Sequence, residues 1–148
     1  MIEFQFPEDQ KYFEDLLLNS KAFSISEFRT MFDFRLPDIK RMEFNKLRNQ
    51  RLKSLKEVHG VRCMLNLDCC DMNSGVAVDH LIPISSNKLN KEIRNLKAEK
   101  GKKVKTQSFG SNHFDNLIIA CNKCNNHKKH RILSSEKIRS ILHQKNNI

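Results

Sequence analysis

An acid and a histidine stand side by side in the stretch GVAVDHLIPIS, where Asp79 and His80 follow a short apolar run. An imidazole with its ordinary pKa of about 6.5 can take a proton from water, and a carboxylate is a ligand for a hard cation such as Mg²⁺. Such a pair could serve metal-assisted hydrolysis. Taken alone, however, the doublet is more typical of a strand end whose side chains make local hydrogen bonds.

The five cysteines of the chain indicate a structural metal site. Cys121 and Cys124 form a C-x-x-C pair, whose spacing lets both sulfurs turn toward one ion. Tetrahedral Zn²⁺ needs two more ligands, and adjacent cysteines rarely bind one ion together, so we expect Cys63 with Cys70, or with Cys69 in its place. Four thiolates would leave no open position for a substrate. The alternatives are reduced core thiols or, less favoured, a redox pair.

Three short patterns occur in a fixed order: the DH doublet, an N-L pair before an apolar run, and C-x-x-C-N at the start of a helical segment. This order resembles the HNH endonucleases, which are ββα-metal (His-Me finger) nucleases. The form that it resembles holds a structural zinc ion and has asparagine at the last motif position (H-N-N). The resemblance covers about residues 60–133.

The resemblance implies a role for each matching residue. His80 corresponds to the general base that deprotonates the attacking water, and Asn116 to the asparagine that holds the loop bearing this histidine. Asp79 and Asn125 correspond to the protein ligands of a catalytic Mg²⁺ or Mn²⁺. A carboxylate and an amide oxygen suit such a cation on chemical grounds, and Zn²⁺ would be structural.

The sequence departs from the family in three places. Cys63 lies further from its partner cysteine than in the common C-x-x-C pair, and the stretch between His80 and Asn116 is unusually long. The first sixty residues match no pattern that we can name. The geometry of these parts cannot be transferred from the family.

His127 is a rival for the last position of the motif. On a helix it points about 200° away from Asn125, so the two cannot serve one site, and we favour Asn125. Lys128 and Lys129 lie within about 60° and 40° of Asn125, and we expect both to contact phosphate. We expect His113 to make a structural hydrogen bond in its loop.

The charge distribution favours a polyanionic partner. The formal net charge is +10; residues 1–39 hold four basic and eight acidic residues, whereas residues 40–148 hold 23 and nine. A one-sided basic charge is typical of nucleic-acid binding, although a solvated basic surface is the alternative. In the insert at about 85–111, the lysine-rich part carries the candidate DNA contacts Lys102, Lys103 and Lys105.

The hydrophobic pattern predicts a mixed α+β fold with helices before residue 60. We expect helices at 7–19, from Ser24 through a capping box, and from Pro37 to about Val58. The third helix would expose a basic face made of Lys40, Arg41, Lys46, Arg48, Arg51, Lys53 and Lys56. Short strands are expected at VAV and NLIIA, and a helix at 122–130. The insert should begin as a polar helix with the apolar stripe Leu89, Ile93 and Leu96.

These observations predict a helical region at 1–60 and an HNH nuclease domain at 61–148. We expect an endonuclease that hydrolyses double-stranded DNA, with a homodimeric type II restriction enzyme as the favoured kind. A nicking, homing or repair nuclease and a non-catalytic zinc module that binds nucleic acid are the alternatives. No apolar run reaches the ~18 residues of a membrane span and no signal peptide is evident, so a cytoplasmic protein of a bacterium or phage is expected.

Overall fold

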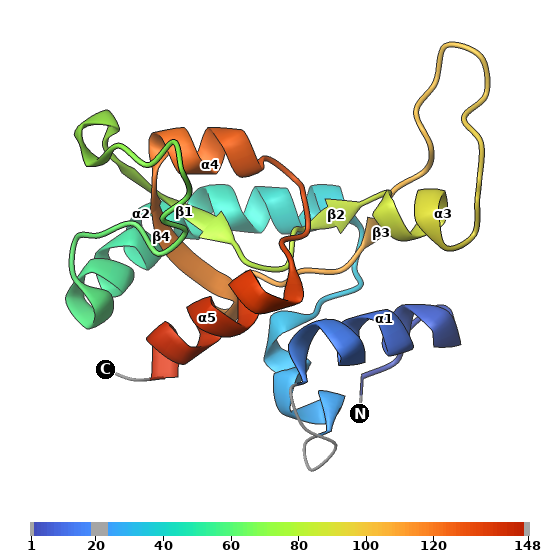
Figure 1. The fold of residues 1–148 in the computed structure, drawn as a ribbon, viewed down its shortest axis with the longest axis horizontal. Coiled ribbons are helices and arrows are strands. Elements are labelled where there is room, and N and C mark those ends of the chain that lie inside the picture. Colours follow the sequence, from blue (N-terminus) through green and yellow to red (C-terminus); the bar gives the residue numbers. More distant parts are fainter. Residues whose placement is uncertain (1, 19–23, 147–148) are drawn as a thin grey trace.

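Helices and short strands alternate along the chain in the computed structural model, which describes residues 2–18 and 24–146 (Figure 1). The predicted mixed α+β class is confirmed. Within those two ranges, no helix combines the length and the apolarity that a bilayer crossing demands.

A hairpin of two strands followed by a helix lies at the centre of the fold (Figure 1). β1 (Val76–His80) pairs antiparallel with β4 (Leu117–Cys121), in a register that sets His80 opposite Leu117. α4 (Asn122–Lys128) follows β4 directly and contacts both strands. Both predicted strands are therefore confirmed, and β4 is buried along its whole length, as its unbroken apolar run indicates.

Three longer helices surround this unit. α1 (Pro7–Leu17) and α2 (Pro37–His59) each begin with a proline in the first turn, where its missing N–H costs no hydrogen bond, and carry acids there. α2 contacts both β1 and β4. α5 (Ser135–Asn146) packs against α1 (Figure 1). The sequence interpretation anticipated α1 and α2 but did not include α5.

The segment after Ser24 differs from its prediction. It forms a 3₁₀-helix, η1 (Ile25–Met31), and the Ser24 hydroxyl accepts a hydrogen bond from the backbone N–H of Ser26, two residues ahead. Two further short 3₁₀-helices are η2 (Met72–Ser74) and η3 (Phe114–Asn116). Ser24 is therefore the N-cap, as expected, but its partner is Ser26 and not the Glu27 N–H of a capping box. The predicted helix type was wrong, because packing sets the winding of so short a segment.

The insert is closed at its base by a two-stranded ladder and projects beyond it as a long loop (Figure 1). β2 (Ser85–Ser86) pairs with β3 (Gln107–Ser108), and α3 (Lys88–Glu92) lies between them in the chain. The predicted apolar stripe is wrong beyond its first member, since Leu89 is fully buried whereas Ile93 and Leu96 are exposed.

A buried ion pair fastens the base of the insert to α1. Arg94 Nη1 lies 2.7 Å from Asp9 Oδ1, and the amide of Gln107 donates to the other carboxylate oxygen at 2.8 Å. The Arg94 guanidinium also lies 4.3 Å from the centre of the Phe6 ring. The loop beyond Arg94 therefore starts from a fixed base.

The predicted basic face of α2 is wrong at Lys40, because the side chain of this residue is fully buried. Its ammonium donates to the backbone carbonyls of Asp33 at 2.7 Å, Ile84 at 2.9 Å and Gly110 at 2.7 Å. Burial lowers the pKa of Lys40 to about 8. Lys40 therefore joins α2 to two chain segments that border the insert, and the other basic residues of α2 remain at least partly exposed.

One hydrophobic core runs through both parts of the chain. It includes Phe13 and Leu17 from α1, Leu55 from α2, Ile119 from β4 and Ile141 from α5. The predicted boundary at residue 60 is therefore the end of α2 and not a break in packing.

Candidate active site and metal centre

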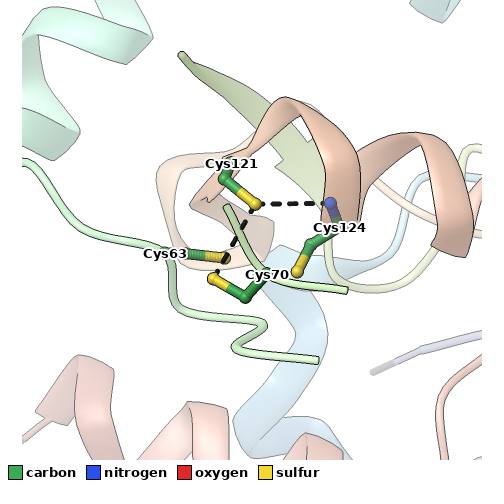
Figure 2. Close-up of side chains that lie close together, drawn as sticks. All are labelled: Cys63, Cys70, Cys121 and Cys124. Carbon is green, nitrogen blue, oxygen red and sulfur yellow. Dashed lines mark hydrogen bonds between the residues drawn. The ribbon is translucent and has the colours of Figure 1, made fainter. Parts of the chain in front are cut away.

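Four cysteine side chains converge at the start of α4 (Figure 2). The sulfurs of Cys63, Cys70, Cys121 and Cys124 all lie within 4.8 Å of one another, and those of Cys70 and Cys121 are 3.8 Å apart. Zinc–sulfur bonds of about 2.3 Å in a tetrahedron place the sulfurs about 3.8 Å apart. The cluster therefore has the donors and the spacing to hold an ion such as Zn²⁺.

The choice between the two adjacent cysteines is decided by the structure. Cys70 belongs to the cluster, whereas Cys69 is exposed and its sulfur lies 3.9 Å from the carbonyl oxygen of Lys123. Cys69 lies in a turn that the Cys70 backbone N–H closes by donating to the Leu67 carbonyl at 2.9 Å, and its thiol lies outside the cluster. Cys70 is the fourth member of the set, as favoured from the sequence.

Backbone N–H groups surround the sulfurs. Cys63 accepts from Asn66 at 3.3 Å and Cys124 accepts from Leu67 at 3.4 Å. The Cys121 sulfur accepts two such bonds, from Asp71 at 3.4 Å and Cys124 at 3.3 Å. Donors of this kind stabilise thiolates and orient them toward a metal.

These donors change the acidity of Cys121. Burial raises the pKa of its thiol, but the N–H groups of Cys124 and Asp71, together with hydrogen bonds to the Cys124 and Cys63 side chains, lower it to about 6. The pKa of Cys70 is raised to about 11, by burial and by the neighbouring thiols Cys63 and Cys121. One thiolate shared among several thiols is the expected metal-free state, so binding of Zn²⁺ should release protons.

A cavity of about 470 Å³ lies between α2, the end of β1 and α4. Its lining includes Asp79 and His80 from β1, Asn125 from α4, and Arg41, Phe44 and Arg48 from α2. The three residues to which the resemblance gives the base and the metal ligands therefore line one cavity. His127 is exposed and is not part of this lining.

A side chain missing from the sequence interpretation, Asn112, fixes the orientation of His80. The Asn112 amide nitrogen donates to the backbone carbonyl of Lys40 at 2.8 Å, which directs its oxygen toward His80 Nε2, also at 2.8 Å. An amide oxygen only accepts, so Nε2 carries the proton and Nδ1 keeps the lone pair. The Phe44 ring packs edge-on against the imidazole, 4.5 Å between centres.

His80 is neutral in this environment. Burial lowers its pKa to about 4; the hydrogen bond to Asn112 opposes the shift, and the positive charges of Lys128, Lys40 and Arg48 add to it. A neutral imidazole with a free lone pair on Nδ1 is the form that can accept a proton.

Asp79 is buried beside a lysine. Its Oδ1 accepts the backbone N–H of His80 at 2.8 Å, and its Oδ2 lies 3.1 Å from Lys128 Nζ, an ion pair without hydrogen-bond geometry. Burial raises the pKa of Asp79 against the opposing charge of Lys128. Lys128 Nζ also donates to the backbone carbonyl of His80 at 3.0 Å.

The expectation that Lys128 contacts phosphate stays a prediction, but in this structure its ammonium is paired with Asp79. Its side chain is only 1% exposed because α4 turns it inward, onto Asp79. Lys129 is exposed and lines the cavity together with His130.

Asn116 holds the segment that follows His80. Its amide nitrogen donates to the carbonyls of Ile82 and Ser111, each at 2.9 Å, and its oxygen accepts the Ile82 backbone N–H at 2.8 Å. Both ends of the amide are used, and the side chain is fully buried. This is the loop-holding geometry that the resemblance implies for this residue.

The remaining candidates lie at the surface. His113 is half-exposed and accepts a hydrogen bond from the backbone N–H of Asp115 at 3.0 Å, as expected for a loop residue. Lys102, Lys103 and Lys105 are exposed in the projecting loop of the insert.

One residue and one ion pair near His80 were missed from the sequence. Asn112 stands in the polar run GSNHFDN, where nothing in the spacing separates it from its neighbours. The ion pair between Lys128 and Asp79 has no local signal either, because a lysine at the end of a polar Asn-Asn-His run is typical of a solvated helix end. Only the packing of α4 against β1 brings the pair together.

Comparison of this chain with protein-family models, with curated proteins and with solved structures found no match.

Proposed function

We propose that this protein is a metal-dependent endonuclease of the HNH type that hydrolyses phosphodiester bonds in double-stranded DNA. One observation carries the proposal: Asp79, His80 and Asn125 line the same cavity on a strand–strand–helix unit, beside a four-cysteine cluster. The order of these residues in the chain and their arrangement in space agree with one another. Sequence similarity to known proteins adds no support.

In the proposed reaction, His80 Nδ1 takes a proton from the attacking water. Asn112 keeps the other ring nitrogen protonated, and burial keeps the ring neutral at neutral pH, so no prior deprotonation is needed. Asn116 binds the backbone of Ile82 in the loop that follows His80, which fixes the position of the end of β1. The base is thus held by a strand and by two asparagines.

The donors of the cavity fit a hard divalent cation. Asp79 Oδ2 is a buried carboxylate oxygen without a hydrogen-bond partner, and Asn125 adds an amide oxygen on the adjacent helix. When bound, Mg²⁺ or Mn²⁺ would neutralise charge on the phosphate and on the departing oxygen. The residues that would hold it are Asp79 and Asn125.

The walls of the cavity suit a phosphate backbone. Arg41 and Arg48 on α2 and Lys129 beyond α4 supply positive charge on the two sides of it. Exposed lysines of the insert extend the basic surface. One such site cuts one strand, so cutting both strands favours a two-fold homodimer, as in a type II restriction enzyme of the bacterial or phage cytoplasm.

Plasmid cleavage tests the proposal. Supercoiled plasmid incubated with the zinc-loaded protein and Mg²⁺ or Mn²⁺ should become nicked or linear, and EDTA should stop the reaction. His80→Ala should lower the cleavage rate by about 10³-fold or more, because the base is lost. His127→Ala is the matched control and should cleave as the wild type does.

The products distinguish the kinds of nuclease. Linear plasmid and discrete fragments from a long DNA would support a restriction enzyme, whereas nicked circles alone would support a nicking, homing or repair nuclease. DNA binding without cleavage under any of these metal conditions would overturn the proposal in favour of a non-catalytic zinc module.

A further inference from the structure

Lys128 occupies a position that a surface lysine does not normally take. It is the last residue of α4, and its ammonium lies 3.1 Å from Asp79 Oδ2 and 3.0 Å from the carbonyl oxygen of His80. The side chain is 1% exposed, yet it belongs to the lining of the cavity. The charge of Lys128 therefore lies at the floor of the candidate site.

Asp79 has only one oxygen available for a cation. Oδ1 is taken by the backbone N–H of His80, which a strand end presents in a fixed direction. Oδ2 is buried, accepts no hydrogen bond and faces Lys128. Any cation that binds Asp79 through Oδ2 must therefore approach the same oxygen that the ammonium already neutralises.

Two positive charges within a few ångströms of each other repel strongly where water is excluded. The carbonyl oxygen of His80 does not compensate, because it carries no net charge. Lys128 has a flexible four-carbon side chain on the last residue of a helix, so it can leave Asp79 without movement of the strand.

We propose that Lys128 is a resident counterion of Asp79, and that a divalent cation binds at Asp79 only in exchange for this ammonium. The inference rests on the proposed function for the identity of the cation. It adds that the metal affinity of the site is set by a lysine of this chain as well as by the ligands. Without metal, the ammonium keeps the buried carboxylate paired.

Calorimetric titration of the zinc-loaded protein with Mn²⁺ tests the exchange. Lys128→Met removes the competing charge and should tighten Mn²⁺ binding by roughly tenfold or more. Lys129→Met is the matched control: it removes the same charge from the exposed neighbour and should change the affinity by less than about threefold. Asp79→Asn should abolish the binding.

Lys128→Met that binds Mn²⁺ no more tightly than the wild type or Lys129→Met would overturn the proposal. Zinc content and a thermal melt show whether this variant folds, because it leaves Asp79 without its counterion. If it does not fold, Lys128→Gln keeps a hydrogen-bond donor and takes its place, with the same expected tightening.

Amine acetylation of the wild-type protein, followed by peptide mass spectrometry, supplies a second readout. Saturating Mn²⁺ should raise the acetylation of Lys128 several-fold and leave that of Lys129 unchanged. Equal acetylation of Lys128 with and without bound Mn²⁺ would contradict the exchange.

Plasmid cleavage keeps the two proposals separate. Tighter Mn²⁺ binding by Lys128→Met, without cleavage by the wild type, would overturn the nuclease and keep the exchange. Cleavage that depends on His80, with equal Mn²⁺ affinities, would overturn the exchange and keep the nuclease.

Discussion

At the scale of single residues, the candidate base depends on side chains that have no chemical role of their own. Asn112 connects His80 to the backbone of α2, because its two amide atoms reach His80 Nε2 and the Lys40 carbonyl at once. The carbonyl can only accept, so the amide cannot flip without losing both hydrogen bonds. Asn112 is therefore a positioning residue, and the tautomer of His80 follows from it.

Replacement of Asn112 tests this role. Asn112→Ala should lower the single-turnover cleavage rate by about 10- to 100-fold, because the imidazole loses the partner that sets its tautomer and orientation. Asn112→Asp keeps an acceptor but adds a negative charge, which favours the protonated ring, so the acid limb of the pH–rate profile should move to higher pH. The measurement is that profile between about pH 5 and 9.

An unchanged profile in Asn112→Asp would count against the contact with His80. His113→Ala, at the exposed neighbour, is the control and should leave both the rate and the profile as in the wild type. A merely structural role for Asn112 would lower the stability of both variants without moving the acid limb.

Residue type explains why part of the site could be foreseen and part could not. Asp79, His80, Asn116 and Asn125 stand in motifs, and three of them line the cavity while Asn116 fixes the adjoining loop. The burial of Lys128 was not foreseen, since lysine is exposed in most proteins and its burial depends on a partner distant in sequence. Lys40 was likewise expected to be exposed, but it is buried and its ammonium donates to three backbone carbonyls.

At the scale of elements, the local sequence pattern was enough to predict the helices and strands that a single strong signal marks. The proline and acids before an amphipathic run gave the starts of α1 and α2, and the unbroken apolar run gave β4. The 3₁₀ winding of η1 was not foreseen, and the polar helix expected at the start of the insert is only the five residues of α3, because tertiary contacts outweigh propensity in segments of one or two turns.

The cysteine cluster is the element whose loss should affect the fold most. Residues 63–70 and the start of α4 are held together by N–H bonds to sulfur that are individually weak. Cys70→Ser should therefore lose zinc and lower the free energy of unfolding by about 3 kcal/mol or more. Metal analysis and chemical denaturation measure the two effects.

Cys69 offers a matched control for this prediction, since it is the adjacent residue with the same side chain. Cys69→Ser should keep one zinc per chain and change the free energy of unfolding by less than about 0.5 kcal/mol, as for an exposed position. Equal zinc loss in both variants would show that the set of four ligands is assigned incorrectly.

At the scale of the whole molecule, the excess positive charge is distributed over several surface regions, which are formed by segments far apart in the sequence. The net charge is +10, and basic residues line the cavity on α2 and beyond α4 and also fill the projecting loop of the insert. The ion pair between Arg94 and Asp9 fastens the base of that loop to α1. The loop can therefore present its lysines from a fixed base while its outer part remains free of packing.

Salt dependence measures whether the loop contacts DNA. Each phosphate contact adds about 0.9 to the slope of log K against log salt concentration, so the triple variant Lys102→Gln, Lys103→Gln, Lys105→Gln should reduce that slope by about 2.7. The measurement is fluorescence anisotropy of the zinc-loaded protein with duplex DNA in buffer without Mg²⁺ or Mn²⁺, so that the DNA is not cleaved. Lys11→Gln with Lys137→Gln, on α1 and α5, is the control for charge alone and should leave the slope nearly unchanged. An equal loss of slope per charge in both variants would mean that the loop lysines act only through the general field of the protein and do not touch the backbone.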